Sequence, residues 1–261
     1  MDCCEIDFVH APRRPPKTWK VAVGATAVVA VAVVVSSASA VRITGDAAQG
    51  VAVVPCKGVY HAGGAPKAPA TLSARVLPEP SGAVDLRFYY YSGAAMLAPK
   101  GWRCSGTSGS NAATVTAWAP SSGTHRALRD NKAVQVPNEV LYAAIHTPGN
   151  WSLEHACEWF PDAARKYQRR NGLVCDGGDN PTGTTFERPG SGTVRVTLPP
   201  GEQGSATSFS GGPNVTVFQI WWAPKAEAAA HAVCALREHR GRTLCTALLA
   251  DFGARFRASV R

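Results

Sequence analysis

Residues 214–222 read NVTVFQIWW, and the interpretation of the whole chain starts from this stretch. In an extended conformation its apolar side chains occupy both faces, which is typical of a strand buried on both sides. We therefore expect an interior strand of a sheet. Pro224 follows and opens PKAEAAAHAVCALREH at 224–239, an Ala-rich stretch with proline where the first turn of a helix tolerates it.

A last helix is expected beyond residue 242. Thr243 can cap this helix, and the charged stretch 237–242, which contains Gly241, suits a turn before it. Its apolar face is formed by leucine and phenylalanine side chains, namely Leu244, Leu248, Leu249, Phe252 and Phe256. The sequence thus predicts a C-terminal pair of antiparallel helices.

Earlier in the chain, the pattern alternates between strands and one helical segment. An apolar stripe over 152–170 predicts a helix with a kink or break at Pro161 and an end at Gly172. Strands are expected at 51–55, 71–77, 84–91, 113–119, 139–146, 183–189 and 191–199. This order predicts one α+β domain over 51–261 with a largely antiparallel sheet, a kinked helix and the C-terminal helix pair.

The N-terminal forty residues are typical of an export signal. Residues 1–20 end in basic side chains and form a cytosolic n-region, and 21–35 are apolar and uncharged. As a helix, 21–35 covers roughly 22 Å, less than the ~30 Å of a bilayer core. Small residues up to Ala40 favour cleavage there, and an uncleaved membrane anchor over 21–40 is the alternative. Residues 41–50 are expected to be a linker, and the domain after it is expected to be secreted or extracytoplasmic.

Six cysteines lie in the exported region, and an even number in such a chain predicts disulfides. Pairing of neighbours along the sequence gives Cys56–Cys104, Cys157–Cys175 and Cys234–Cys245. Zinc is the competing interpretation, but the sequence contains no Cys-x-x-Cys and the spacings match no common zinc layout.

Three segments carry a resemblance to a known group of proteins: LAPKGWRCSG at 97–106, CEWFPDA at 157–163 and CALREHRGRTLCTALLADF at 234–252. Together they resemble a family of uncharacterised secreted proteins from actinobacteria, which share the Gly-Trp-x-Cys block and paired C-terminal cysteines. The resemblance implies export and disulfides, and it brings no known activity.

No catalytic motif is present, and no catalytic, cofactor-binding or metal-binding residue is assigned. Ser108 comes nearest to a nucleophile elbow, but a Gly/Ser-rich hairpin or surface loop is the simpler interpretation. The pairs His155–Glu158 and Glu227–His231 have spacings that suit one helix face, where two such groups bind metal less often than they form an exposed pair. Residues 176–180, DGGDN, suit a turn better than a calcium loop.

Two groups of residues are candidates for a ligand surface. Tyr89 and Tyr91 share one face of a strand and, with Trp102, form either core or an aromatic platform. Arg165, Lys166, Arg169 and Arg170 form a basic flank on the helix after Pro161, which is either a solvated face or a contact for an anionic cell-wall polymer or membrane surface. Export argues against a nucleic-acid partner.

The formal charge supports the same partners without selecting a function. It is +9 for the whole chain, and +8 remains beyond residue 40 because residues 1–40 hold four basic and three acidic groups. Two functions stay open: a non-catalytic binding module of the cell envelope, and a secreted hydrolase with a site built from distant residues. Neither a ligand nor an oligomeric state follows from the sequence.

Overall fold

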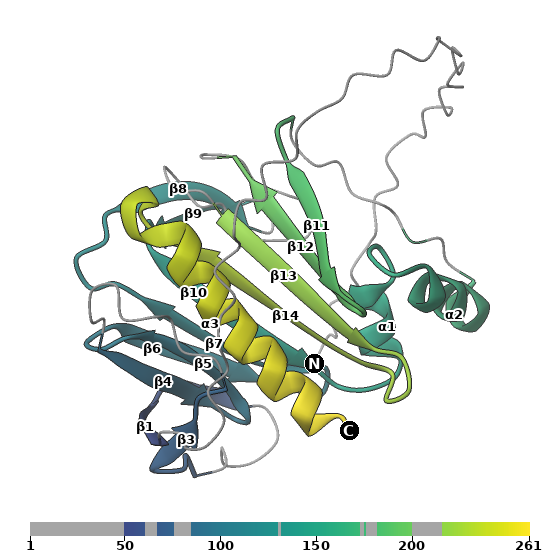
Figure 1. Cartoon of the computed structure of the whole chain (residues 1–261), viewed down its shortest axis with the longest axis horizontal. Coiled ribbons are helices and arrows are strands. Elements are labelled where there is room, and N and C mark those ends of the chain that lie inside the picture. The colour runs from purple at the N-terminus through teal and green to yellow at the C-terminus, as the bar shows by residue number, and fades with distance from the viewer. Residues whose placement is uncertain are drawn as a thin grey trace, which may run out of the picture. The chain divides into compact units, whose positions relative to one another are not determined.

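The computed structural model describes residues 50–60, 67–75, 85–129, 132–172, 175, 182–199 and 216–261. The expected n-region, signal or anchor segment, cleavage site at Ala40, most of the linker 41–50 and the loop 176–180 lie outside these ranges. Within them the chain forms three sheets and three helices (Figure 1). None of these helices is both long and apolar enough to cross a membrane.

The largest sheet of the described part has eight strands in the order β11-β12-β13-β14-β10-β7-β6-β2, antiparallel except for β2 beside β6. Its strands are β2 (Lys57–Tyr60), β6 (Arg103–Ser108), β7 (Ala112–Trp118), β10 (Val140–His146), β11 (Thr185–Gly190), β12 (Thr193–Leu198), β13 (Thr216–Ala223) and β14 (Ala228–Ala235). The expected strand 214–222 corresponds to β13, which lies between β12 and β14 as its apolar pattern predicts.

A second sheet has four strands in the order β3-β1-β4-β5, and β8 and β9 form a separate hairpin. The strands of both are β1 (Gly50–Pro55), β3 (Thr71–Ser73), β4 (Leu86–Tyr91), β5 (Ala94–Pro99), β8 (Thr124–Arg129) and β9 (Lys132–Pro137). The helices are α1 (Asn150–Ala156), α2 (Pro161–Asn171) and α3 (Glu238–Ser259). A largely antiparallel, strand-rich α and β fold with a C-terminal helix is therefore confirmed.

Two apolar cores lie on opposite faces of the eight-stranded sheet. The four-stranded sheet and α3 cover one face, where Trp221 packs against Phe252 with ring centroids 5.3 Å apart. On the other face, α1 and α2 cover the half formed by β12, β13 and β14, where Phe218, Ile220 and Val233 are buried. Figure 1 shows α3 running across the sheet, with α1 and α2 at the ends of the strands.

The predicted C-terminal helix pair is wrong. The Ala-rich stretch after Pro224 forms a turn and then β14, and α3 begins at Glu238, so Thr243 lies inside the helix and caps nothing. Alanine favours helices, but β14 lies between β13 and β10 and is buried on both faces. Its small side chains let α1 and α3 approach from opposite sides, and this packing outweighs local propensity.

Of the two alternatives at Pro161, a kink or a break, the structure has the break, which gives two separate helices in place of one kinked helix. α1 ends at Ala156, and α2 begins with Pro161 at its first position and is closed by Gly172 in the left-handed conformation. Both boundaries of α2 thus match the sequence signals. Between the helices, Trp159 and Phe160 are buried in the core that also contains Phe218 and Ile220. The break between α1 and α2 lets these two side chains enter that core.

Three disulfides join the described elements, in the pairs that the sequence order gives: Cys56–Cys104, Cys157–Cys175 and Cys234–Cys245. The last one links β14 to α3, where two helices were expected. Disulfides of this number are typical of proteins from oxidising, extracytoplasmic compartments.

Gly106 tests the packing of the two sheets. A Cβ atom at this position of β6 would lie 2.2 Å from Cγ of Tyr91, a buried ring of β4. We expect Gly106→Ala to lower the free energy of unfolding by about 1–3 kcal/mol, because the ring has to move within a packed core. Urea denaturation measures the change. Gly190→Ala is the matched control, since nothing lies within 4 Å of its added Cβ. Equal stability of the two variants would contradict this packing.

Candidate functional site

Two histidines from neighbouring strands meet on the sheet face that carries α1. β10 and β14 pair with Ala144 opposite His231, so His146 lies two residues further along β10 on the same face. The side chains approach diagonally, and His146 Nε2 lies 2.9 Å from His231 Nδ1. His146 is 4% exposed, so the pair forms at the edge of the buried core.

A third histidine comes from α1. The chain leaves β10 at His146, turns at Gly149 with φ +96°, and enters α1, which brings His155 back over the strand. The rings of His155 and His146 stack with centroids 3.8 Å apart, and those of His155 and His231 are 5.9 Å apart. One ligand nitrogen from each ring lies within 4.8 Å of the other two. We call these three residues the histidine cluster.

Ser152 fixes α1 above the two strands. Its buried hydroxyl donates to the carbonyl of Thr147 at 3.0 Å and accepts from the backbone N–H of Ala229 in β14 at 2.9 Å. One side chain therefore joins the end of β10, the first turn of α1 and β14, the three elements that supply the cluster. Cys157–Cys175 ties the other end of α1 immediately after His155.

Burial keeps the cluster neutral. Loss of hydration is the main cause that lowers the pKa of His146 to about 2, and the neighbouring His231 and His155 lower it further. The pKa of His231 falls to about 3, again mainly by burial. His155 reaches the surface, yet desolvation against the other rings also lowers its pKa. Three neutral imidazoles retain the lone pairs that a metal ion requires.

One ring nitrogen of the cluster lacks a hydrogen-bond partner among the described residues. Nδ1 of His146 is buried and finds no hydrogen-bond partner among the described residues. Such groups are rare in folded proteins, and an ion or an ordered water commonly accounts for them. The three converging ring nitrogens fit a bound ion. An ion between Nε2 of His146 and Nδ1 of His231 would leave Nδ1 of His146 to an ordered water, because the two nitrogens of one ring point in different directions.

Aromatic side chains surround the cluster on the core side. The ring of Phe218 lies 5.6 Å from that of His231, and Tyr142 lies 5.5 Å from it on the other side. Trp159 continues this aromatic wall, packing against Phe218 at 5.8 Å and against Phe186 at 6.2 Å. Rings thus line the cluster toward the core, whereas His155 is exposed and His231 is partly exposed.

The carboxylates expected beside two of these histidines have other roles. Glu227 lies in the turn before β14, not on a helix with His231, and its carboxylate binds Lys166 at 3.2 Å and Arg170 at 2.9 Å. The hydrogen bond from Arg170 is the main cause that lowers the pKa of Glu227. Glu158 lies after the end of α1, so it shares no helix with His155.

The basic flank predicted as a ligand surface is partly used within the protein. Lys166 and Arg170 hold the turn of Glu227, and Arg165 pairs with Asp162 one turn away on α2. Arg169 lies exposed in the last turn of α2. Two of the four flank residues, Lys166 and Arg170, thus link α2 to the turn before β14.

Of the two alternatives for Tyr89 and Tyr91, core and aromatic platform, the structure gives the core. Tyr89 is 1% exposed and Tyr91 is 5% exposed, because the second sheet packs this face of β4 against the first. The Tyr89 hydroxyl donates to the carbonyl of Pro99 at 2.8 Å and accepts from the backbone N–H of Trp102 at 2.9 Å. Trp102 is half-buried against the same core. Ser108 ends β6 in the β6–β7 hairpin, in agreement with the Gly/Ser-rich hairpin interpretation, and Ser92 donates to its hydroxyl at 3.0 Å.

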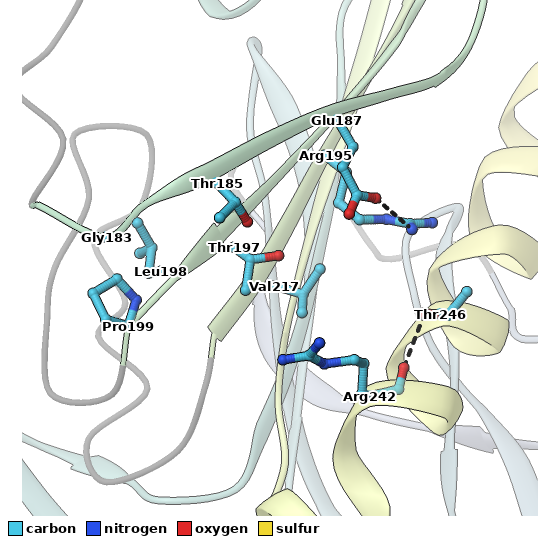
Figure 2. Close-up of a pocket in the computed structure, with 10 residues that line it drawn as sticks. All are labelled: Gly183, Thr185, Glu187, Arg195, Thr197, Leu198, Pro199, Val217, Arg242 and Thr246. Atoms are coloured by element: carbon cyan, nitrogen blue, oxygen red, sulfur yellow. Dashed lines mark hydrogen bonds and ion pairs between the residues drawn. The ribbon is translucent and has the colours of Figure 1, made fainter. Parts of the chain in front are cut away.

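A separate hollow of about 330 Å³ lies on the α3 side of the sheet, where Thr185, Thr197 and Arg242 line it (Figure 2). Its one carboxylate, Glu187, is bonded to Arg195 at 3.1 Å. The described residues of this lining include no carboxylate besides Glu187 and no histidine, so the histidine cluster is the stronger candidate for a functional site.

Sequence reasoning found two members of the cluster and missed the third. His155 and His231 were weighed only with nearby acids, on helices, and the strand assignment of β14 removes that geometry for His231. His146 ends a stretch whose alternation places it on the face of Tyr142. Nothing in the sequence shows that residues 85 positions apart form a cross-strand contact.

Comparison of the chain with protein families, curated proteins and solved structures gives no match.

The depressed pKa values predict an acid-sensitive fold. His146 and His231 titrate near pH 2–3 when folded and near 6.5 in their ordinary state, so the unfolded chain binds more protons between these limits. Their contribution is complete above pH 6.5 and is lost progressively as the pH falls toward 3. For the metal-free protein, we expect the free energy of unfolding to drop between pH 6.5 and 5 by up to about 2 kcal/mol per histidine.

Urea denaturation at several pH values measures this slope. The range above pH 5 excludes Glu227, whose pKa lies below its ordinary value of 4.5. The double variant His146→Gln, His231→Gln should lose most of the slope. An equally steep fall in that variant would assign the acid sensitivity to other groups.

Proposed function

We propose that this protein is an exported, disulfide-bonded domain of the cell envelope or extracellular space that binds one transition-metal ion at its histidine cluster. The observation that carries the proposal is the convergence of His146, His155 and His231 from three elements, with ligand nitrogens within 4.8 Å of one another. The disulfides and the apolar segment 21–35 support export. The resemblance to secreted actinobacterial proteins stays a prediction that agrees with it.

The donor set indicates the class of metal. Three neutral imidazoles suit Zn²⁺, Cu²⁺, Ni²⁺ or Co²⁺, whereas Mg²⁺ and Ca²⁺ prefer oxygen ligands. Cys157, the nearest sulfur in sequence to His155, is bonded to Cys175 and offers no thiolate. Among these metals, Zn²⁺ imposes no geometric preference of its own, so it tolerates a site built from two strands and a helix.

Metal binding is tested by isothermal titration calorimetry with ZnCl₂ and the metal-free protein at pH 7.5. We expect one ion per chain, and we expect His155→Ala to weaken binding by about 100-fold or more because it removes a ligand. His155 reaches the surface, so this variant should stay folded, which circular dichroism checks. Zinc should also raise the melting temperature of the natural protein and not that of the variant.

His125→Ala is the matched control, because His125 lies on β8 in the separate hairpin. It should bind zinc like the natural protein. Binding that survives His155→Ala, or that His125→Ala abolishes, would reject the assignment of the site.

One observation favours hydrolysis as a second candidate function. The cluster offers three ligands among the described residues, and its His155 side is open to water, whereas structural zinc sites are usually closed by four protein ligands. A fourth, water-filled position would let the metal lower the pKa of bound water to about 7. The resulting hydroxide would attack the carbonyl carbon of an ester and break its bond to the leaving alcohol.

The hydrolase is tested with p-nitrophenyl acetate and the zinc-loaded protein. A hydrolytic site predicts a rate that rises with an apparent pKa near 7 and is lost in His155→Ala. Zinc binding without zinc-dependent hydrolysis would reject the hydrolase and leave the binding function standing.

A further inference from the structure

Among the described residues, only half of the sheet face that carries the histidine cluster is covered. α1 packs against β13 and β14, while β7, β6 and β2 continue the same face beyond β10. Side chains on these strands alternate between the two faces: Val115, Ala117 and Leu141 point into the core shared with the second sheet. Their neighbours in sequence therefore point the other way.

The registers align these outward residues into a row. Tyr142 of β10 lies opposite Thr116 of β7, Thr116 opposite Ser105 of β6, and Ser105 opposite Lys57 of β2. Beside this row, Trp118 lies opposite Arg103. Three strand spacings make the row about 14 Å long, which suits an extended chain better than a small ion. We call these six residues the open half-face.

The open half-face combines three kinds of chemistry. Lys57, Arg103 and Ser105 are exposed, whereas Thr116, Trp118 and Tyr142 are partly exposed. None of the strands β2, β6, β7 and β10 contains Asp or Glu, so its charge is positive. Aromatic rings, hydroxyls and cations together match a polymer whose units have apolar C–H faces, hydroxyls and negative charges.

From this arrangement we infer that the open half-face binds an acidic polysaccharide. Sugar rings would pack against Trp118 and Tyr142, sugar hydroxyls would bond Ser105 and Thr116, and carboxylates would pair with Lys57 and Arg103. An anionic membrane is the weaker partner, because membrane-binding surfaces carry protruding apolar side chains and this row is mostly polar. The inference does not depend on a bound metal.

Gly58 and Gly106 explain why this face can be flat and open. Each lies against the ring of Tyr91 on the opposite face, where a Cβ would meet the ring at 2.8 and 2.2 Å. Close packing below the strands thus supports β6 and β2 from the side of the second sheet.

The test measures binding of the full protein to alginate, an acidic polysaccharide, by biolayer interferometry at low salt. Lys57→Glu with Arg103→Glu should weaken binding by about tenfold or more, and so should Trp118→Ala, which leaves the charge unchanged. Arg165→Ala and Trp151→Ala are the controls, because both residues are exposed on the helices away from the row. Both should bind like the natural protein.

Four other probes separate the sources of binding. Neutral pullulan should bind more weakly than alginate. In competition with alginate for the protein, three other probes should each bind less tightly: polyglutamate, a single-stranded oligonucleotide and phosphatidylglycerol vesicles. If polyglutamate bound as tightly as alginate, positive charge alone would explain the binding, and the inference would be overturned. Tighter binding of vesicles or oligonucleotide than of alginate would overturn the inference as well. So would an unchanged affinity for alginate in the variant that carries Lys57→Glu and Arg103→Glu.

Discussion

The burial of β14 on both faces is the constraint on which the rest of the structure depends. This strand pairs with β13 along its whole length and with β10 from Ala230 to Ala235, and its alanines leave space for α3 on one side and α1 on the other. Larger side chains from the neighbours, such as Trp221 and Phe218, fill the layers above and below. A strand of small residues thus lets two helices and two cores share one sheet.

The same constraint creates the histidine cluster. His231 is the one titratable side chain of β14, and the strand holds it under α1 beside His146. A charged imidazole would lose its hydration there, so the ring stays neutral and remains a metal ligand rather than a cation. Ser152 and Cys157–Cys175 then hold α1 at both ends, which fixes His155 over the pair. The packing that stabilises the fold therefore also positions the three histidines of the cluster.

Much of this fold follows from the sequence. The apolar pattern of 214–222 places β13 inside the sheet, Pro161 and Gly172 mark α2, and the cysteine order gives the disulfides. These signals are local, and a turn, a cap or a doubly apolar strand can be recognised from its own residues. The prediction of a helix over 224–239 is wrong because the helix propensity of alanine is outweighed where a segment pairs with strands on both sides and is buried in a sheet.

The candidate site was far less accessible to sequence reasoning. Its residues come from two strands and one helix, and the contact between His146 and His231 depends on the register of β10 against β14. Register is set by tertiary packing, so a single sequence does not reveal it. Tyr89 and Tyr91 show the reverse case: alternation gave them a shared face correctly, but the second sheet that buries this face was unknown.

X-ray absorption spectroscopy of the zinc-loaded protein tests the central claim most directly, because it reports the atoms bound to the ion. The account predicts about three imidazole nitrogens at 2.0–2.1 Å, with any remaining light ligand supplied by water. Multiple-scattering features from imidazole should weaken in His155→Ala. A first shell of oxygen atoms alone, or one containing sulfur at about 2.3 Å, would place the ion elsewhere and contradict the histidine cluster as the metal site.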